Sequence, residues 1–116
     1  MEEIGAECFS GIGAEELYIP NSVHTIEKNA FDLMNKLIRI DFGIGVQNLG
    51  YAILQGCDNL EKVVFHGPKP QNVDDYVFFG AANLCKFYFE PGAEGWVDGE
   101  VWRGRTFNVY TGQQAE

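Results

Sequence analysis

Apolar residues recur along this chain at a regular spacing. Each repeat opens with one apolar residue, and a second follows five positions later. The opening residues are Ile4, Ile26, Leu49 and Val73, and the second residues are Phe9, Phe31, Leu54 and Phe78. Successive openers lie 22, 23 and 24 residues apart. A period of this size indicates a solenoid, in which each coil can bury its apolar side only against its neighbours.

A second pattern predicts one short β-strand in each coil. Apolar and polar residues alternate there with the period of two that is typical of a strand with one buried face. The residues expected to face inward are Leu17 and Ile19, Ile40 and Phe42, Val63 and Phe65, and Phe87 and Phe89. Since successive coils run in the same direction, these strands should form a parallel sheet. The opposite wall should hold single turns or short 3-10 segments, because the intervening apolar segments are too short for helices.

The repeats divide the chain, as one domain, into four coils and a terminal segment. The expected coils span residues 4–25, 26–48, 49–72 and 73–92. Residues 93–110 break the period and contain Trp96 and Trp102, and their last five residues alternate as a fifth strand would. Because a stack of coils leaves its last apolar face open, we expect this segment to be a C-terminal cap, followed by a polar tail at 111–116.

The first coil has no corresponding cap before Ile4. This open N-terminal edge is consistent with truncation, with a partner chain on the edge, or with protection of the edge by acidic residues. Those acidic residues are Glu2, Glu3 and Glu7. Self-association through this edge is therefore one expectation.

Three segments resemble the BspA-like class of leucine-rich repeats. They are IGAECFSG at residues 4–11, IPNSVHTI at 19–26 and LQGCDNLEKVVF at 54–65. The resemblance extends from residue 4 to about residue 92, and EPGAEGW at 90–96 is similar to the usual ending of that class. It implies a β-rich α/β fold, namely a right-handed leucine-rich-repeat solenoid with a parallel sheet, about four coils and a C-terminal cap. It also implies a bacterial, phage or protist origin, and many members of the class are large surface proteins used in adhesion and host contact.

Composition and charge exclude several classes of function. The 116 residues are 46% hydrophobic and 22% charged, as in ordinary globular domains. No apolar run approaches the roughly 20 residues that cross a bilayer, so membrane insertion is not expected. A formal net charge of -9 argues against direct binding of duplex nucleic acid, which requires a basic face. The start of the chain does not resemble a signal peptide, so we expect a cytoplasmic protein if Met1 is the native start. We expect a surface or secreted protein if the chain is excised from a larger one.

The cysteines indicate packing rather than chemistry. Cys8, Cys57 and Cys85 form no C-x-x-C pair, and an odd number does not indicate a disulfide framework. Cys8 and Cys57 fall at apolar repeat positions and should be buried. Cys85 falls at the repeat position of Ile38 and Glu61, which predicts a more exposed thiol.

No other pattern indicates a cofactor, a metal or an active site. His24 and His66 have no neighbours at metal-ligand spacing. Ser10 and Ser22 do not lie in a nucleophile motif. We therefore expect a protein without enzymatic activity.

The outward-facing residues of the strands form the candidate binding site. Neighbouring strands lie about 4.8 Å apart, so equivalent residues form columns along the sheet. One column contains Glu16, Arg39, Lys62 and Lys86, and it holds three of the eight basic residues of an acidic chain. The residues expected to bind a partner, from this column and the two beside it, are Tyr18, Arg39, Asp41, Lys62, Val64, His66, Lys86, Tyr88 and Tyr110. The alternative is that the lysines only keep the sheet face soluble.

Three functional hypotheses follow. The first is a non-enzymatic module that binds a protein through the exposed face of its parallel sheet, with adhesion or host contact as the role that the resemblance implies. The second is a small acidic, phage-type inhibitor whose carboxylates imitate phosphates on a nucleic-acid-binding enzyme. The third is a structural end fragment of a longer repeat array. None of these patterns identifies the partner.

Overall fold

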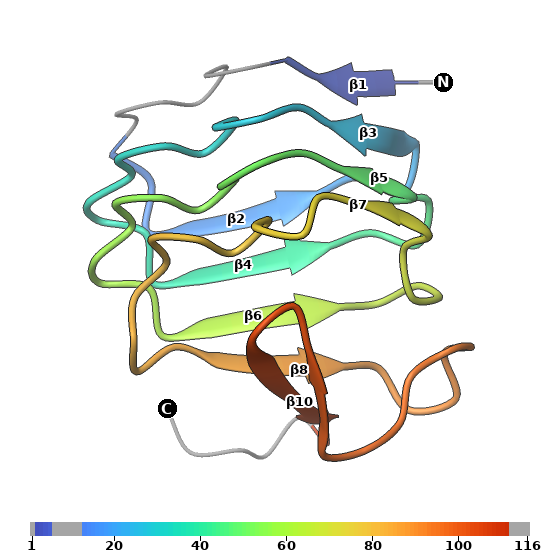
Figure 1. Cartoon of the computed structure of the whole chain (residues 1–116). Coiled ribbons are helices and arrows are strands. Elements are labelled where there is room, and N and C mark those ends of the chain that lie inside the picture. The colour runs from blue at the N-terminus through green and yellow to red at the C-terminus, as the bar shows by residue number, and fades with distance from the viewer. Residues whose placement is uncertain (1, 6–12, 112–116) are drawn as a thin grey trace.

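The computed structural model describes residues 2–5 and 13–111. These residues contain β-strands and no helix (Figure 1). The strands are β1 (Glu2–Ile4), β2 (Glu16–Ile19), β3 (Val23–Ile26), β4 (Arg39–Phe42), β5 (Asn48–Leu49), β6 (Lys62–Phe65), β7 (Asn72–Val73), β8 (Lys86–Phe89), β9 (Glu100–Trp102) and β10 (Arg105–Val109). The β-rich repeat fold expected from the sequence is confirmed.

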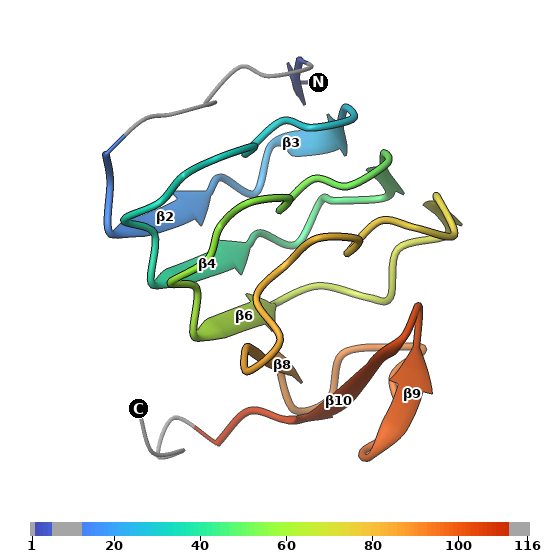
Figure 2. The same ribbon diagram turned by 60° about the vertical axis from the view of Figure 1, so that its left-hand side comes forward.

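The strands form two sheets. The main sheet has the order β2-β4-β6-β8-β10-β9, and the minor sheet has the order β1-β3-β5-β7. Neighbouring strands are parallel except for β9, which is antiparallel to β10. From β3 onward, the chain of each coil passes from the minor sheet through a turn segment to the main sheet (Figures 1 and 2). The result is a parallel β-solenoid of about four turns.

The minor sheet is a feature that the sequence pattern did not predict. Its strands contain the repeat openers, with Ile26 opposite Leu49 and Leu49 opposite Val73. A ladder of polar side chains runs across it, because Asn48 Nδ2 donates to Thr25 Oγ1 at 2.9 Å. Asn72 Nδ2 continues the ladder to Asn48 Oδ1, also at 2.9 Å.

The wall that follows the minor sheet consists of turns, as expected. Residues 28–33, 51–56 and 75–80 form these turns in successive coils. Their backbone bonds connect the coils, since Phe31 N donates to Ile53 O at 3.1 Å and Ile53 N donates to Val77 O at 3.0 Å. Residues 6–12, which include Cys8 and Phe9, lie outside the described residues.

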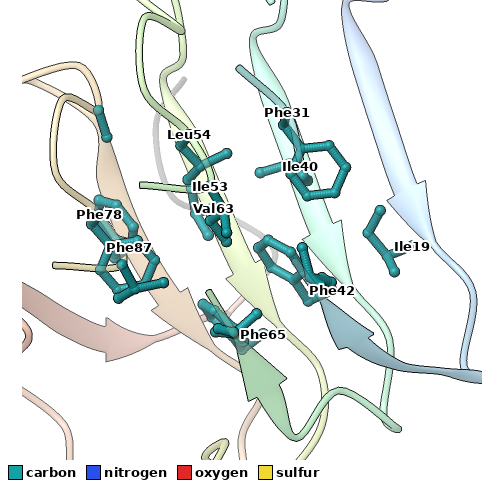
Figure 3. Packing of buried hydrophobic residues seen from close by; sticks show 14 of the residues in the cluster. Ile19, Phe31, Ile40, Phe42, Ile53, Leu54, Val63, Phe65, Phe78 and Phe87 are labelled. Carbon is teal, nitrogen blue, oxygen red and sulfur yellow. The ribbon is translucent and has the colours of Figure 1, made fainter. Parts of the chain in front are cut away.

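Side chains from the main sheet and the turns meet in one core (Figure 3). The strand pairing places Phe42 opposite Phe65 and Phe65 opposite Phe89. The rings of Phe42 and Phe65 are stacked with centroids 4.6 Å apart. Burial of such aromatic stacks is a large part of the stability of a small domain.

The segment after Gly92 closes the C-terminal end of the stack with side chains. The expected fifth strand is β10, which pairs with β8. Trp96 Nε1 donates to Gly67 O at 3.0 Å, and its ring packs against Phe65. Arg105 donates to Ala81 O and Ala82 O at 2.9 Å, so its guanidinium binds carbonyl groups of the last coil.

The fourth coil differs from the third where it enters the main sheet. Leu60 is 2% exposed, whereas Leu84, at the same repeat position, is 90% exposed. Cys85 is buried instead of Leu84. In the third coil the turn bond runs from Leu60 N to Cys57 O, and in the fourth coil the corresponding bond runs from Cys85 N to Ala82 O, which is one residue later in the repeat. The predicted exposure of Cys85 is therefore wrong. Burial raises the pKa of the Cys85 thiol to about 12 and that of Cys57, buried as predicted, to about 11.

Candidate protein-binding face

The strands of the main sheet bring the nine expected binding residues onto one outward face. Tyr18 and Lys86 are exposed on it, and Arg39, His66 and Tyr110 are half-buried. The other four residues are buried, namely Asp41, Lys62, Val64 and Tyr88. The expectation that this face is exposed throughout is therefore wrong at its centre.

Tyr110 is the main reason why the centre of the face is covered. Tyr110 comes directly after β10, yet its ring reaches across the sheet. The ring centroid lies 5.5 Å from Cζ of Arg39 in β4 and 5.6 Å from Nζ of Lys62 in β6. Its ring also contacts Tyr88 of β8, with centroids 5.7 Å apart. These side chains form a layer over the sheet, and Val64 in the middle of it is 0% exposed.

A chain of charges crosses the same face at the ends of the strands. Arg39 binds Asp41 with two hydrogen bonds, from Nε to Oδ1 at 2.6 Å and from Nη2 to Oδ2 at 2.9 Å. His66 Nε2 lies 2.7 Å from Asp41 Oδ2, and His66 Nδ1 lies 2.7 Å from Glu90 Oε1. Both ring nitrogens of His66 thus face carboxylates, an arrangement that favours the protonated ring with two donors.

The charges in this chain shift one another's pKa values. Burial acts to lower the pKa of His66, but its hydrogen bonds to Asp41 and Glu90 outweigh burial and raise it above 6.5. Burial acts to raise the pKa of Asp41, but the bonds from Arg39 and His66 lower it below 3.8. The network therefore holds a buried carboxylate between two cations.

A groove of about 660 Å³ lies beside this layer, where the main-sheet strands begin. The first residue of each of the strands β2, β4, β6 and β8 lines it. The residues that line it are Glu16, Ile38, Arg39, Glu61, Lys62, Leu84, Lys86 and Tyr88. Four of them, Arg39, Lys62, Lys86 and Tyr88, belong to the nine expected binding residues. The groove thus combines three cationic and two acidic side chains with exposed apolar surface.

Leu84 and Lys86 dominate the exposed part of the groove. Leu84 projects into solvent, and Ile38 is 38% exposed. No ion pair or hydrogen bond is formed by the Lys86 side chain within residues 2–5 and 13–111. An apolar side chain and an acidic group of a partner would both find contacts here.

Sequence reasoning missed Leu84 and Ile38 as surface residues of this site. Leu84 aligns with the buried Leu37 and Leu60, so the repeat pattern contains no signal for its exposure. Tyr110 was expected on the face, but the spacing did not indicate that its ring covers Lys62.

The described part of the chain has no grouping typical of a metal site or of a membrane-spanning helix. No group of three or more His, Cys, Asp or Glu side chains in residues 2–5 and 13–111 is arranged to hold a metal ion. These residues also contain no helix of the length and apolarity that spanning a membrane requires.

A comparison with protein families gives one match. The model described as the BspA type leucine rich repeat region matches residues 2–95, in six copies. No curated protein and no solved structure matches the chain.

Proposed function

Because the chain belongs to the BspA-type leucine-rich repeat family, we propose that it is a non-enzymatic module that binds a protein partner through the outward face of its main sheet. Leucine-rich-repeat solenoids are typically interaction scaffolds, and their stacked coils form extended binding surfaces. The observation that carries the proposal is the groove at the start of the main-sheet strands. It is the place on this face where exposed apolar and cationic groups adjoin.

The groove favours a partner segment that combines an apolar and an acidic side chain. Leu84 and Ile38 offer apolar surface in the same groove, and contiguous exposed apolar surface marks interaction sites. Lys86 and Arg39 place positive charge beside that surface in a chain of net charge -9. Opposite charges across an interface steer the encounter and fix the register of binding.

The nine expected residues have different roles in this proposal. Tyr18 and Lys86 are open to direct contact with a partner. Asp41 and Val64 are buried, so they support the face from beneath. His66 holds Asp41 and Glu90 together at the edge of the face.

Affinity capture with a matched pair of variants tests the proposal. The baits are the full chain, a groove variant with Leu84→Ser and Lys86→Glu, and a control variant with Phe79→Ser and Lys28→Glu. All four positions are exposed, and the control positions lie on the turn segments rather than the main sheet. We expect a partner to be held by the full chain and the control but lost by the groove variant. A partner held equally by all three baits would overturn the assignment of the face.

The source of the captured partner separates the competing roles. Capture from host-surface material supports adhesion, and capture from a bacterial lysate supports an intracellular role. A partner displaced by nucleic acid and by salt would instead support the acidic-inhibitor hypothesis. Pairing of the chain with itself through β1 and β2 would support the end-fragment hypothesis.

A further inference from the structure

The ring of Tyr110 occupies a slot whose walls come from three strands. We call this the Tyr110 slot and define it by Arg39 of β4, Lys62 of β6 and Tyr88 of β8. The ring centroid lies 5.5 Å from Arg39 Cζ and 5.6 Å from Lys62 Nζ, within the range of cation–π attraction. Val64 lies between Lys62 and His66 along β6 and is fully buried.

The position of Tyr110 does not depend on its ring. Its backbone N donates to Phe89 O at 2.7 Å, which continues the pairing of β10 with β8. The strand pairing therefore does not require the ring to occupy the slot. Departure of the ring would uncover the apolar Val64 and the cationic Lys62.

The slot is chemically suited to an aromatic group that carries negative charge. Two cationic side chains face one ring, and Tyr88 supplies an aromatic wall. A ring satisfies the cation–π geometry, and an attached anion would add direct charge attraction. Asp41 lies on the same face and is bound by Arg39 and His66, and Glu16 and Glu61 line the adjoining groove.

We propose that the Tyr110 slot is a subsite for an aromatic side chain of an acidic partner segment, and that Tyr110 is its internal competitor. The proposal rests on the proposed function, because Arg39, Lys62 and Tyr88 also line the groove. A partner segment in the groove reaches the slot by displacing Tyr110. Because the Tyr110 ring must first be displaced, it lowers the affinity of the slot for the partner's aromatic side chain.

Phenyl phosphate is the probe for this subsite, because it joins an aromatic ring to an anion. Inorganic phosphate is the control probe that carries the charge without a ring, and benzyl alcohol is the control probe that carries the ring without a charge. Binding is measured by backbone amide shifts of the full ¹⁵N-labelled chain. The variants are Tyr110→Ala and Tyr110→Gln, which remove the ring, and Tyr76→Ala as the control. Tyr76 is also an exposed tyrosine, but it lies on a turn segment rather than on the main sheet.

We expect both Tyr110 variants to bind phenyl phosphate about tenfold more tightly than the full chain, because the competing contacts of the Tyr110 ring with Arg39 and Lys62 are lost. The shifts should centre on Arg39, Lys62 and Tyr88, and Tyr76→Ala should behave as the full chain does. Equal affinity of folded Tyr110 variants and the full chain would overturn the proposal. So would equal binding of inorganic phosphate, because the slot would then recognise charge alone. The loss or retention of a captured partner by the groove variant does not depend on the outcome of the phenyl phosphate titration, so the two proposals can fail separately.

Discussion

His66 Nε2 lies 2.7 Å from Asp41 Oδ2, on a carboxylate that is almost entirely buried. The other ring nitrogen of His66 lies 2.7 Å from Glu90 Oε1. Only the protonated ring can donate to both carboxylates. The protonation of His66 is therefore coupled to the stability of the fold.

The first prediction concerns pH. The pKa of His66 is raised in the folded chain, so its contribution to stability is complete below 6.5 and is lost as pH rises through the folded pKa. The loss should be about 1 kcal/mol, because the His66 ring is 29% exposed and Glu90 is 51% exposed, so solvent screens part of the interaction. Urea unfolding between pH 5.5 and pH 8.5 measures it.

His66→Gln should remove this pH dependence, whereas His24→Gln should leave it in place. Equal slopes of unfolding free energy against pH in the full chain and His66→Gln would contradict the prediction.

Asp41 acts in the opposite sense at low pH. Its lowered pKa means that its contribution is lost as pH falls below 3.8.

The second prediction concerns Phe65, the centre of the aromatic core. Its ring contacts Phe42, Trp96 and Phe107, and it is 2% exposed. Phe65→Ala should lower the free energy of unfolding by about 3–5 kcal/mol, because it leaves a large cavity. The matched control is Phe79→Ala, at an exposed ring, which should cost much less in the same urea titration. Similar losses would show that the core is not organised around Phe65.

The third prediction concerns a close approach between two coils. A Cβ atom at Gly67 would lie 2.5 Å from Ile44 O and 2.6 Å from Ile44 Cα. Gly67→Ala should therefore destabilise the fold by about 1–3 kcal/mol, since backbone atoms must move apart.

Gly13→Ala is the control for this substitution, because its nearest atom would be Lys36 Cδ at 3.9 Å. It should change stability by less than about 0.5 kcal/mol. Thermal unfolding of the two variants side by side distinguishes them. A Gly67→Ala variant as stable as Gly13→Ala would mean that the coils can separate without cost.

The fourth prediction concerns the C-terminal end of the stack. Arg105 donates to Ala81 O and Ala82 O, and its guanidinium also lies 5.1 Å from the ring centroid of Phe87. Arg105→Met should cost about 1.5–3 kcal/mol, the range for hydrogen bonds from a charged group. Lys86→Met removes a cation that is exposed, and it should be nearly neutral in the same unfolding assay. Equal effects of the two substitutions would refute this role of Arg105.

The fold could be predicted because the period and the alternation agree with each other. Val63 and Phe65 recur in phase with Ile40 and Phe42, and the structure pairs them in that register. The minor sheet escaped prediction because β5 and β7 contain only two residues each, too few for an alternating pattern.

The site was less predictable, because side-chain direction decides it. The column spacing places Tyr110 near His66 and Glu90, but its ring instead reaches Arg39. Leu84 has the same repeat position as Leu60, yet a shift of one turn bond exposes it. Neither change leaves a trace in the periodicity of apolar residues.

The direction of the bonds between turns has a consequence for how such chains evolve. The turn of the second coil donates to carbonyl groups of the third, as Phe31 does to Ile53, and the turn of the third coil donates to the fourth, as Ile53 does to Val77. A coil duplicated within the stack would meet the same donors and acceptors that its neighbours already use. Arg105 would still bind carbonyl groups of whichever coil came last, and Trp96 would still bind a carbonyl group of the coil before it. Gene duplication can thus lengthen or shorten the array by whole coils, while substitutions confined to the outward face change what it binds.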